Sequence, residues 1–215
     1  MLCDDALLTA ALAENLDSAF ERLAHAWEQR LYAFALRMTG RPRDAEELAQ
    51  ETLAQAWRAL SDYSPERRRA LRLRPWLFQI AANLARNRAR AARRGAALSL
   101  DNDAPLADGS DGATTHTLAE RLADEDPLGR PEEVMAREQR LADLAALLLT
   151  LPEPQRVVVI LRHVEGLGYA AIAEVTGEPV GTVKSHASRG VARLRRALER
   201  EMERERVAEA QEVAR

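Results

Sequence analysis

Apolar side chains in the first half of the chain recur at steps of three and four residues, which is the spacing of one helix face. One set spans residues 45–60, with Pro42 placed where a helix N-terminus is expected. A second set spans residues 76–84 and is preceded by Pro75. The polar segment 61–65 separates the two sets and ends in a proline, so the pattern predicts two helices with a break between them.

The second half of the chain continues the helical pattern. Residues 141–151 are mostly apolar and precede Pro152, which predicts a helix that ends at that proline. The valine-rich run 157–161 is compatible with a strand or with a buried helix, and its charged neighbours favour a helix from about residue 154 to 165. The predicted fold class is all-α.

The composition changes in the middle of the chain. Residues 95–131 are rich in Asp, Gly and Pro and offer too little apolar surface to offset the entropy of ordering them. A segment of this length is too long for a loop inside one compact domain, so it predicts a flexible linker between two small helical domains. The expected divisions are a domain at 1–95, an acidic linker at 96–137, a domain at 138–200 and a charged tail at 201–215.

The window that begins at Tyr169 has the spacing of a helix-turn-helix. Ala173, Gly177 and Val183 stand at its fifth, ninth and fifteenth places. Two crossing helices favour a small side chain at the fifth place, and the turn needs a positive φ at the ninth, which glycine adopts without strain. Valine at the fifteenth place is suited to pack between the helices. The C-terminal domain is therefore predicted to be a helix-turn-helix.

The second helix of this motif has a divided surface. Its polar positions are Lys184, Ser185, His186, Ser188, Arg189, Arg193 and Arg196. A charge run of this kind is by itself more typical of a solvated helix face. The helix-turn-helix spacing, together with the absence of acids from 182–198, favours a helix that reads the major groove of DNA.

The distribution of charge is more informative than the formal net charge of −3. Residues 65–94 hold ten arginines and a single acid, whereas residues 96–137 carry a net charge of −7. Two basic stretches on either side of an acidic middle predict two surfaces for a polyanion. They also suggest that the linker suppresses DNA binding by the free chain, in which case replacing its acids with Ser and Asn tightens that binding at low salt.

Several classes of protein are excluded by simple features. No apolar run reaches the roughly 18 residues needed to span a membrane, and the first ten residues lack the basic start of a secretory signal, so a cytoplasmic protein is expected. Cys3 is the only cysteine and the four histidines lack ligand spacing, so no metal, cofactor or catalytic residue is predicted. Residues 166–171 match a dinucleotide-binding pattern, but basic residues stand where the ribose-binding acid belongs. The chain is not expected to be an enzyme.

Three groups of segments resemble a bacterial RNA polymerase sigma factor of the extracytoplasmic function (ECF) type. They occur along the chain in the same order as in that family. Asp44–Trp57 is similar to the helix that binds core polymerase in that family, and Arg74–Asn83 to its promoter-melting and −10-reading segment. The segments Leu151–Arg156, Gly166–Gly177 and Pro179–Ser185 are similar to its −35-reading domain.

The resemblance implies contacts residue by residue. Glu47, Gln50 and Glu51 would bind the clamp helices of the largest polymerase subunit. The −10 DNA would be bound by Asn83, Arg86, Asn87, Arg90 and Arg93, with the loop before Pro75 holding an extruded base. The −35 element would be read by Thr182, Lys184, Ser185, His186, Arg189 and Arg193. Asn87 stands where the family usually has Asp, and His186 where it usually has Arg.

The implied function is transcription initiation: binding core RNA polymerase, recognising −10 and −35 elements in duplex and single-stranded promoter DNA, and promoting strand opening. The resemblance also admits an anti-sigma factor as a partner. The alternative is a stand-alone helix-turn-helix regulator of transcription. It accounts for residues 166–198 but leaves residues 44–94 without a role.

Overall fold

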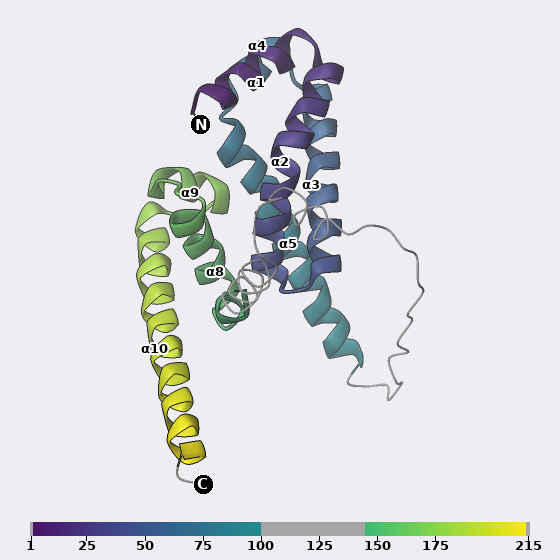
Figure 1. Cartoon of the computed structure of the whole chain (residues 1–215). Coiled ribbons are helices and arrows are strands. Elements are labelled where there is room, and N and C mark those ends of the chain that lie inside the picture. The colour runs from purple at the N-terminus through teal and green to yellow at the C-terminus, as the bar shows by residue number, and fades with distance from the viewer. Residues whose placement is uncertain (1, 100–144, 214–215) are drawn as a thin grey trace.

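The computed structural model describes residues 2–99 and 145–213, and every regular element within those ranges is a helix (Figure 1). The helices are α1 (Leu2–Glu14), α2 (Leu16–Thr39), α3 (Pro42–Asp62), α4 (Pro65–Arg69), α5 (Leu73–Ser99), α8 (Glu153–Val159), the π-helical η1 (Ile160–Val164), α9 (Tyr169–Thr176) and α10 (Val180–Val213). We call α1–α5 the first unit and residues 145–213 the second unit. The predicted all-α class is confirmed, while most of the predicted linker lies outside the described residues.

Caps fix where the helices of the first unit begin and end. The Asn15 side chain accepts a hydrogen bond from the Ser18 N–H and starts α2, while Gly40 ends it with φ 74° and an N–H donated to the Leu36 carbonyl. Glycine adopts this left-handed conformation without strain. Because only Gly40 and Arg41 separate α2 from α3, the two helices run side by side (Figure 1).

Aromatic and leucine side chains fill the centre of the first unit. Phe78 of α5 lies against Trp27 and Phe34 of α2, with ring centroids 5.9 Å and 5.2 Å apart. Leu48 of α3 and Leu77 of α5 are fully buried in the same cluster. These contacts hold α5, and with it the basic residues of its exposed side, in a fixed position on α2 and α3.

The predicted break between the two N-terminal helices is confirmed. α3 ends at Asp62, and the short α4 follows, started by the Ser64 hydroxyl, which accepts from the Arg67 N–H. Pro75 lies in the first turn of α5, where its missing N–H costs no intrahelical hydrogen bond. α5 continues to Ser99, past the expected domain end at residue 95.

The second unit contains the predicted helix-turn-helix. The ambiguous run 157–161 is helical, and α8 widens into η1, whose end is marked by a hydrogen bond from the Glu165 N–H to the Ile160 carbonyl at 2.9 Å. Gly177 ends α9 with φ 71°, as its place in the motif requires. Val183 is fully buried at the start of α10, so the spacing of the motif is realised in the structure.

The two units are packed together. α5 lies against α9, and one continuous apolar cluster includes buried residues of both units. Arg156 joins them most directly: Nη1 donates to the Met38 carbonyl at 2.6 Å, and Nη2 donates to the carbonyls of Leu149 and Leu151 at 3.0 Å and 2.9 Å. The side chain of Leu149 also covers Gly40, at the end of α2.

Candidate nucleic-acid interface

The first turns of α10 present one side to the core and the other to solvent. Val183, Ala187 and Gly190 are buried, and a Cβ at Gly190 would lie 2.6 Å from Val159 Cγ2, so α10 is closely packed on α8. Of the residues predicted to read the −35 element, Thr182, Lys184, Arg189 and Arg193 are exposed, whereas Ser185 and His186 are half-buried. The helix therefore offers an unobstructed basic surface at the position where a helix-turn-helix enters the major groove.

Two of these side chains have neighbours that the sequence pattern does not reveal. Lys184 Nζ lies 5.9 Å from the centre of the Tyr169 ring, and the Arg162 guanidinium lies 4.6 Å from the same ring. His186 Nε2 lies 3.7 Å from Glu178 Oε2, and only 18% of the His186 side chain is exposed. Lys184 thus belongs to a cationic cluster around an aromatic ring, and His186 faces a carboxylate.

The residues predicted to bind −10 DNA share the outer part of α5 but differ in their surroundings. Asn83, Asn87 and Arg90 are exposed. Arg86 is only 25% exposed, because its Nε lies 3.6 Å from Glu153 Oε1 at the start of α8. The side chain of Arg93 lies outside the described part of the structure.

A pocket opens beside the start of α5, at the loop predicted to hold an extruded base. Its volume is about 290 Å³. It is lined by Arg67, Ala70, Leu71, Arg72, Pro75, Trp76, Gln79, Glu174 and Val175. The last two belong to α9 of the second unit, and both Glu174 carboxylate oxygens accept from Arg72 Nη1, at 2.8 Å and 2.9 Å. Arg72, one of the basic residues that line this pocket, is therefore paired with a carboxylate of the second unit.

A buried carboxylate lies deeper between the units. Glu165 is 5% exposed and accepts from Arg30 Nε at 2.8 Å, with Arg74 Nη2 at 3.9 Å. Burial lowers the pKa of Arg74, the charge of Arg30 lowers it further, and Glu165 acts in the opposite direction. Burial likewise lowers the pKa of Arg37, again opposed by Glu165. One carboxylate is thus surrounded by three cations of the first unit.

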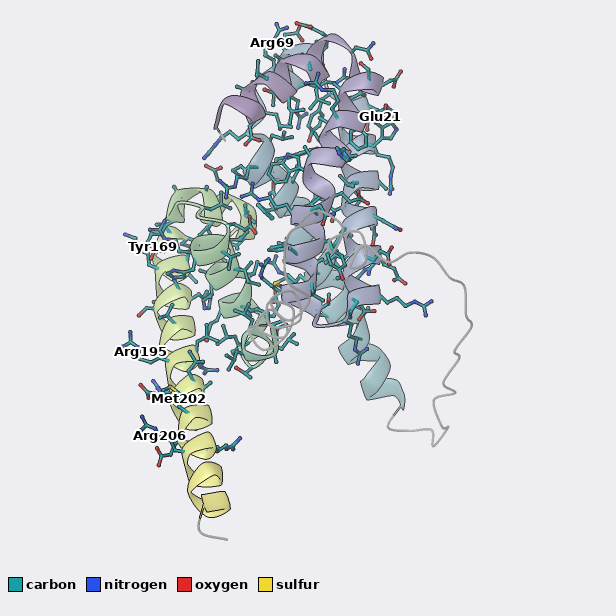
Figure 2. All side chains as sticks on the ribbon, in the orientation of Figure 1. Glu21, Arg69, Tyr169, Arg195, Met202 and Arg206 are labelled. Atoms are coloured by element: carbon teal, nitrogen blue, oxygen red, sulfur yellow. The ribbon has the colours of Figure 1, made fainter. Side chains whose placement is uncertain are left out.

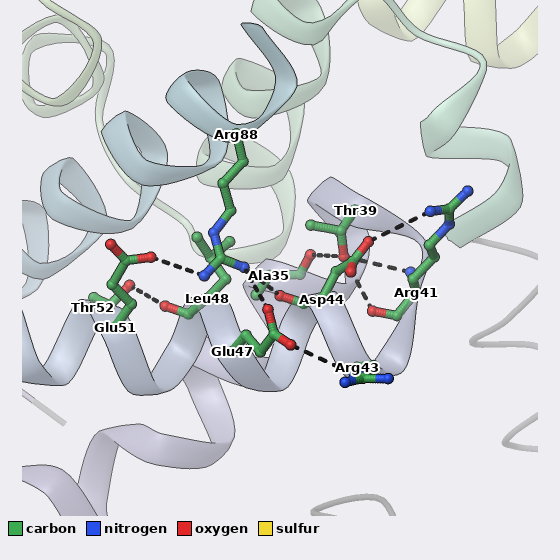
Figure 3. Close-up of polar contacts among 10 residues, drawn as sticks. All are labelled: Ala35, Thr39, Arg41, Arg43, Asp44, Glu47, Leu48, Glu51, Thr52 and Arg88. Carbon is green, nitrogen blue, oxygen red and sulfur yellow. Dashed lines mark hydrogen bonds and ion pairs between the residues drawn. The ribbon is translucent and has the colours of Figure 1, made fainter. Parts of the chain in front are cut away.

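The acidic side of α3 carries the residues predicted to bind polymerase. Glu47 and Gln50 are exposed and Glu51 is half-buried. Figure 3 shows that Glu47 and Glu51 both reach Arg88 of α5, at 3.6 Å and 2.8 Å. Arg43 approaches Glu47 from the solvent side, at 3.6 Å.

The distal part of α10 carries a further group of charges. Figure 2 shows Arg195, Met202 and Arg206 spaced along the C-terminal half of α10. Leu198 and Met202 are exposed, at 46% and 54%. Within residues 2–99 and 145–213, no helix is long and apolar enough to cross a membrane, and no His, Cys, Asp and Glu cluster is suited to hold a metal ion.

Comparisons with known proteins identify the family of the chain. Residues 23–95 match the family described as Sigma-70 region 2, and residues 141–194 match Sigma-70, region 4. The chain is 33% identical over 181 residues to the ECF RNA polymerase sigma factor SigE of Mycolicibacterium smegmatis, which covers 82% of this chain and 60% of that protein. It is 30% identical over 201 residues to the RNA polymerase sigma factor CnrH of Cupriavidus metallidurans, covering 93% and 96%.

A solved structure is similar over most of the chain. It is the sigma factor RpoE of Bartonella quintana in complex with the anti-sigma factor NepR, with a TM-score of 0.58, 25% identity and coverage of 84% of this chain and 96% of that one. The chain belongs to the sigma-70 family of RNA polymerase sigma factors and is of the ECF type. Members of this family are transcription initiation factors that act with RNA polymerase.

Proposed function

We propose that the chain directs core RNA polymerase to promoters by reading a −35 and a −10 element and by promoting strand opening. The observation that carries this proposal is that one chain presents two separate basic surfaces, on α10 and α5, and an acidic surface on α3 beside the second. A regulator that binds duplex DNA by itself needs only the first of the three.

At the −35 element, the exposed start of α10 enters the major groove. Thr182, Lys184 and Ser185 lie in its first two turns and reach base edges, while Arg189 and Arg193 follow one and two turns later. Arginine pairs well with guanine edges and with phosphates, because its planar guanidinium donates two parallel hydrogen bonds. His186 reaches the DNA once its contact with Glu178 is exchanged for one with a base or phosphate.

At the −10 element, α5 and the pocket at Pro75 act on a strand that leaves the duplex. Unstacking a base costs a few kcal/mol, and a pocket that encloses the base offsets this cost. Asn83 and Asn87 carry amides that both donate and accept, as base recognition requires. Arg86 and Arg90 supply charge for the phosphates.

Polymerase brings the two DNA surfaces to the spacing of the promoter. Glu47, Gln50 and Glu51 bind basic side chains of the clamp helices, and the linker runs through the channels of the enzyme. Each DNA surface binds weakly alone, and docking raises the effective concentration of the second once the first is bound. Because Arg86 and Arg72 are paired with acids of the second unit, the two units separate when both elements are bound.

An anti-sigma factor is the expected inhibitory partner. The support is the similarity to the RpoE structure, in which RpoE is bound to such a partner, NepR. The protein would act in the cytoplasm, together with polymerase.

The test is reconstitution from purified parts. The chain is mixed with core polymerase and a library of promoter fragments, and complex formation and transcripts are measured. The proposal expects a stable complex and transcripts that start at defined promoters and require the chain. A chain that binds duplex DNA as a dimer on a palindrome but does not associate with core polymerase would instead be the stand-alone regulator.

A further inference from the structure

Arg88 is the side chain that joins the acidic side of α3 to α5. Its Nη2 donates to Glu51 Oε2 at 2.8 Å, and its Nη1 lies 3.6 Å from Glu47 Oε2 and 3.3 Å from the Asp44 carbonyl oxygen (Figure 3). One guanidinium thus contacts three successive turns of α3. Two of its partners are the carboxylates predicted to bind polymerase.

Arg88 is distinct from the arginines of α5 that are suited to DNA. The exposed residues Asn83, Asn87 and Arg90 are separated by four and three positions and so share one side of the helix. Arg88 lies outside that spacing, faces α3, and is 35% exposed. Its position therefore serves the acidic surface rather than the basic one.

Glu47 and Glu51 would be poorly fixed without this contact. They are four residues apart on one helix, where like charges repel by a few tenths of a kcal/mol. A glutamate side chain also loses up to about 2 kcal/mol of rotamer entropy when a partner immobilises it. Arg88 compensates the repulsion and restricts both side chains before any partner arrives.

The contact leaves both carboxylates open to a partner. Glu47 and Glu51 remain 53% and 38% exposed with Arg88 in place, because the guanidinium approaches from the α5 side. A carboxylate offers about four acceptor sites. On Glu47, Arg43 already lies on the solvent side at 3.6 Å, and this highly exposed i,i+4 pair is weak enough to be exchanged for a cation of the partner while Arg88 stays in place.

We propose that Arg88 is a positioning residue that holds Glu47 and Glu51 in the geometry that binds core polymerase; this inference rests on the proposed function. It assigns a role in polymerase binding to a residue of the helix that otherwise serves DNA. Removal of Arg88 weakens polymerase binding although Arg88 itself does not contact polymerase.

The experiment measures the affinity of the full chain for purified core polymerase by fluorescence anisotropy. Arg88→Ala is expected to weaken binding about five- to tenfold, and Arg88→Lys to restore part of the loss, because an ammonium carries the charge but cannot span both acids. Arg58→Ala is the matched control: this exposed arginine of α3 donates a hydrogen bond to the Ala54 carbonyl of its own helix and forms no ion pair with another described residue, so its loss should leave the affinity unchanged.

A double-mutant cycle separates positioning from a general effect on the fold. In a Glu47→Gln, Glu51→Gln background, Arg88→Ala should cause no further loss. An equal loss in that background would overturn the inference, as would wild-type or tighter affinity for Arg88→Ala alone. A wild-type chain that does not bind core polymerase would overturn the proposed function as well, so the two failures are distinguishable.

Discussion

Arg189 is the residue on which the proposed −35 contact depends most directly. It is exposed on α10, six residues after the buried Val183, and within the described residues it is not paired with Glu178, the acid that faces His186. Its guanidinium can therefore reach DNA without the loss of an internal ion pair.

Arg189→Ala is expected to weaken binding to a −35 duplex by about 1–3 kcal/mol if the side chain contacts a base. The measurement is a titration of labelled promoter DNA with the polymerase complex. Arg195→Ala removes the same charge from the same exposed helix and should change the affinity far less. Equal losses for the two variants would show that Arg189 contributes only general charge.

The turn between α9 and α10 gives a second prediction, at Gly177. With φ 71° and open space around the site, a side chain there meets no steric obstacle but occupies a strained backbone conformation. Gly177→Ala is therefore expected to lower the free energy of unfolding by about 1–2 kcal/mol. Gly181→Ala, within α10 and also in open space, should instead stabilise the chain by about 0.5–1 kcal/mol. Urea unfolding of both variants checks the pair, and a neutral Gly177→Ala would contradict the strain argument.

At the scale of single elements, α3 provides a test in which folding and binding are separable. Glu51→Arg would place two cations together at Arg88, so it should weaken the α3–α5 contact and lower the thermal stability. It should also weaken polymerase binding by roughly 2–5 kcal/mol. Adding Arg88→Glu restores the ion pair with residue 51 in reversed charge, while the new carboxylate faces Glu47, which lies 3.6 Å from Arg88 in the wild type. The double variant should therefore regain part of the lost thermal stability but no polymerase affinity, as followed by circular dichroism and by anisotropy.

If the double variant recovered polymerase affinity along with stability, the acidic side of α3 would not be the binding surface. The charge of Glu51 would then matter only for folding.

The helices themselves are largely predictable from the sequence, since the signals that define them are local. The spacing of Ala173, Gly177 and Val183 predicts the helix-turn-helix, and the structure confirms it. The run 157–161 could be either strand or helix by periodicity alone, because short β-branched segments suit both. The sequence also indicates that Arg88 lies on a different side of its helix from Asn83 and Asn87. Those two are four residues apart and share one side, whereas Arg88 directly follows Asn87.

At the scale of the whole molecule, the contacts between the units are not predictable in this way. The ion pair of Arg86 with Glu153 and that of Arg72 with Glu174 each join residues of different units, far apart in the sequence. No local pattern selects these partners from the many other charged residues of the chain. The structure adds that two residues predicted to bind DNA, Arg86 and His186, face the carboxylates of Glu153 and Glu178 within the chain.

Removal of these acids should expose the −10 surface. Glu153→Gln with Glu174→Gln is expected to tighten binding of the free chain to a single-stranded oligonucleotide about two- to fivefold at low salt, the range of two partly exposed ion pairs. Glu21→Gln with Glu199→Gln changes the net charge equally at exposed positions and serves as the control. Equal tightening in both variants would attribute the effect to net charge alone, and no tightening would show that the pairs do not restrain this surface.

The hydrogen bonds of Arg156 have a consequence for how reversibly the units separate. Among the carbonyls that it contacts, Leu149 and Leu151 belong to its own unit and Met38 belongs to the other. If the units part as the proposed function requires, the bond to Met38 is exchanged for water while the bonds to Leu149 and Leu151 hold the guanidinium in place. When the units close again, the Arg156 side chain is already in the rotamer that the closed form requires. Ordering this long side chain therefore adds little to the free-energy barrier for closing.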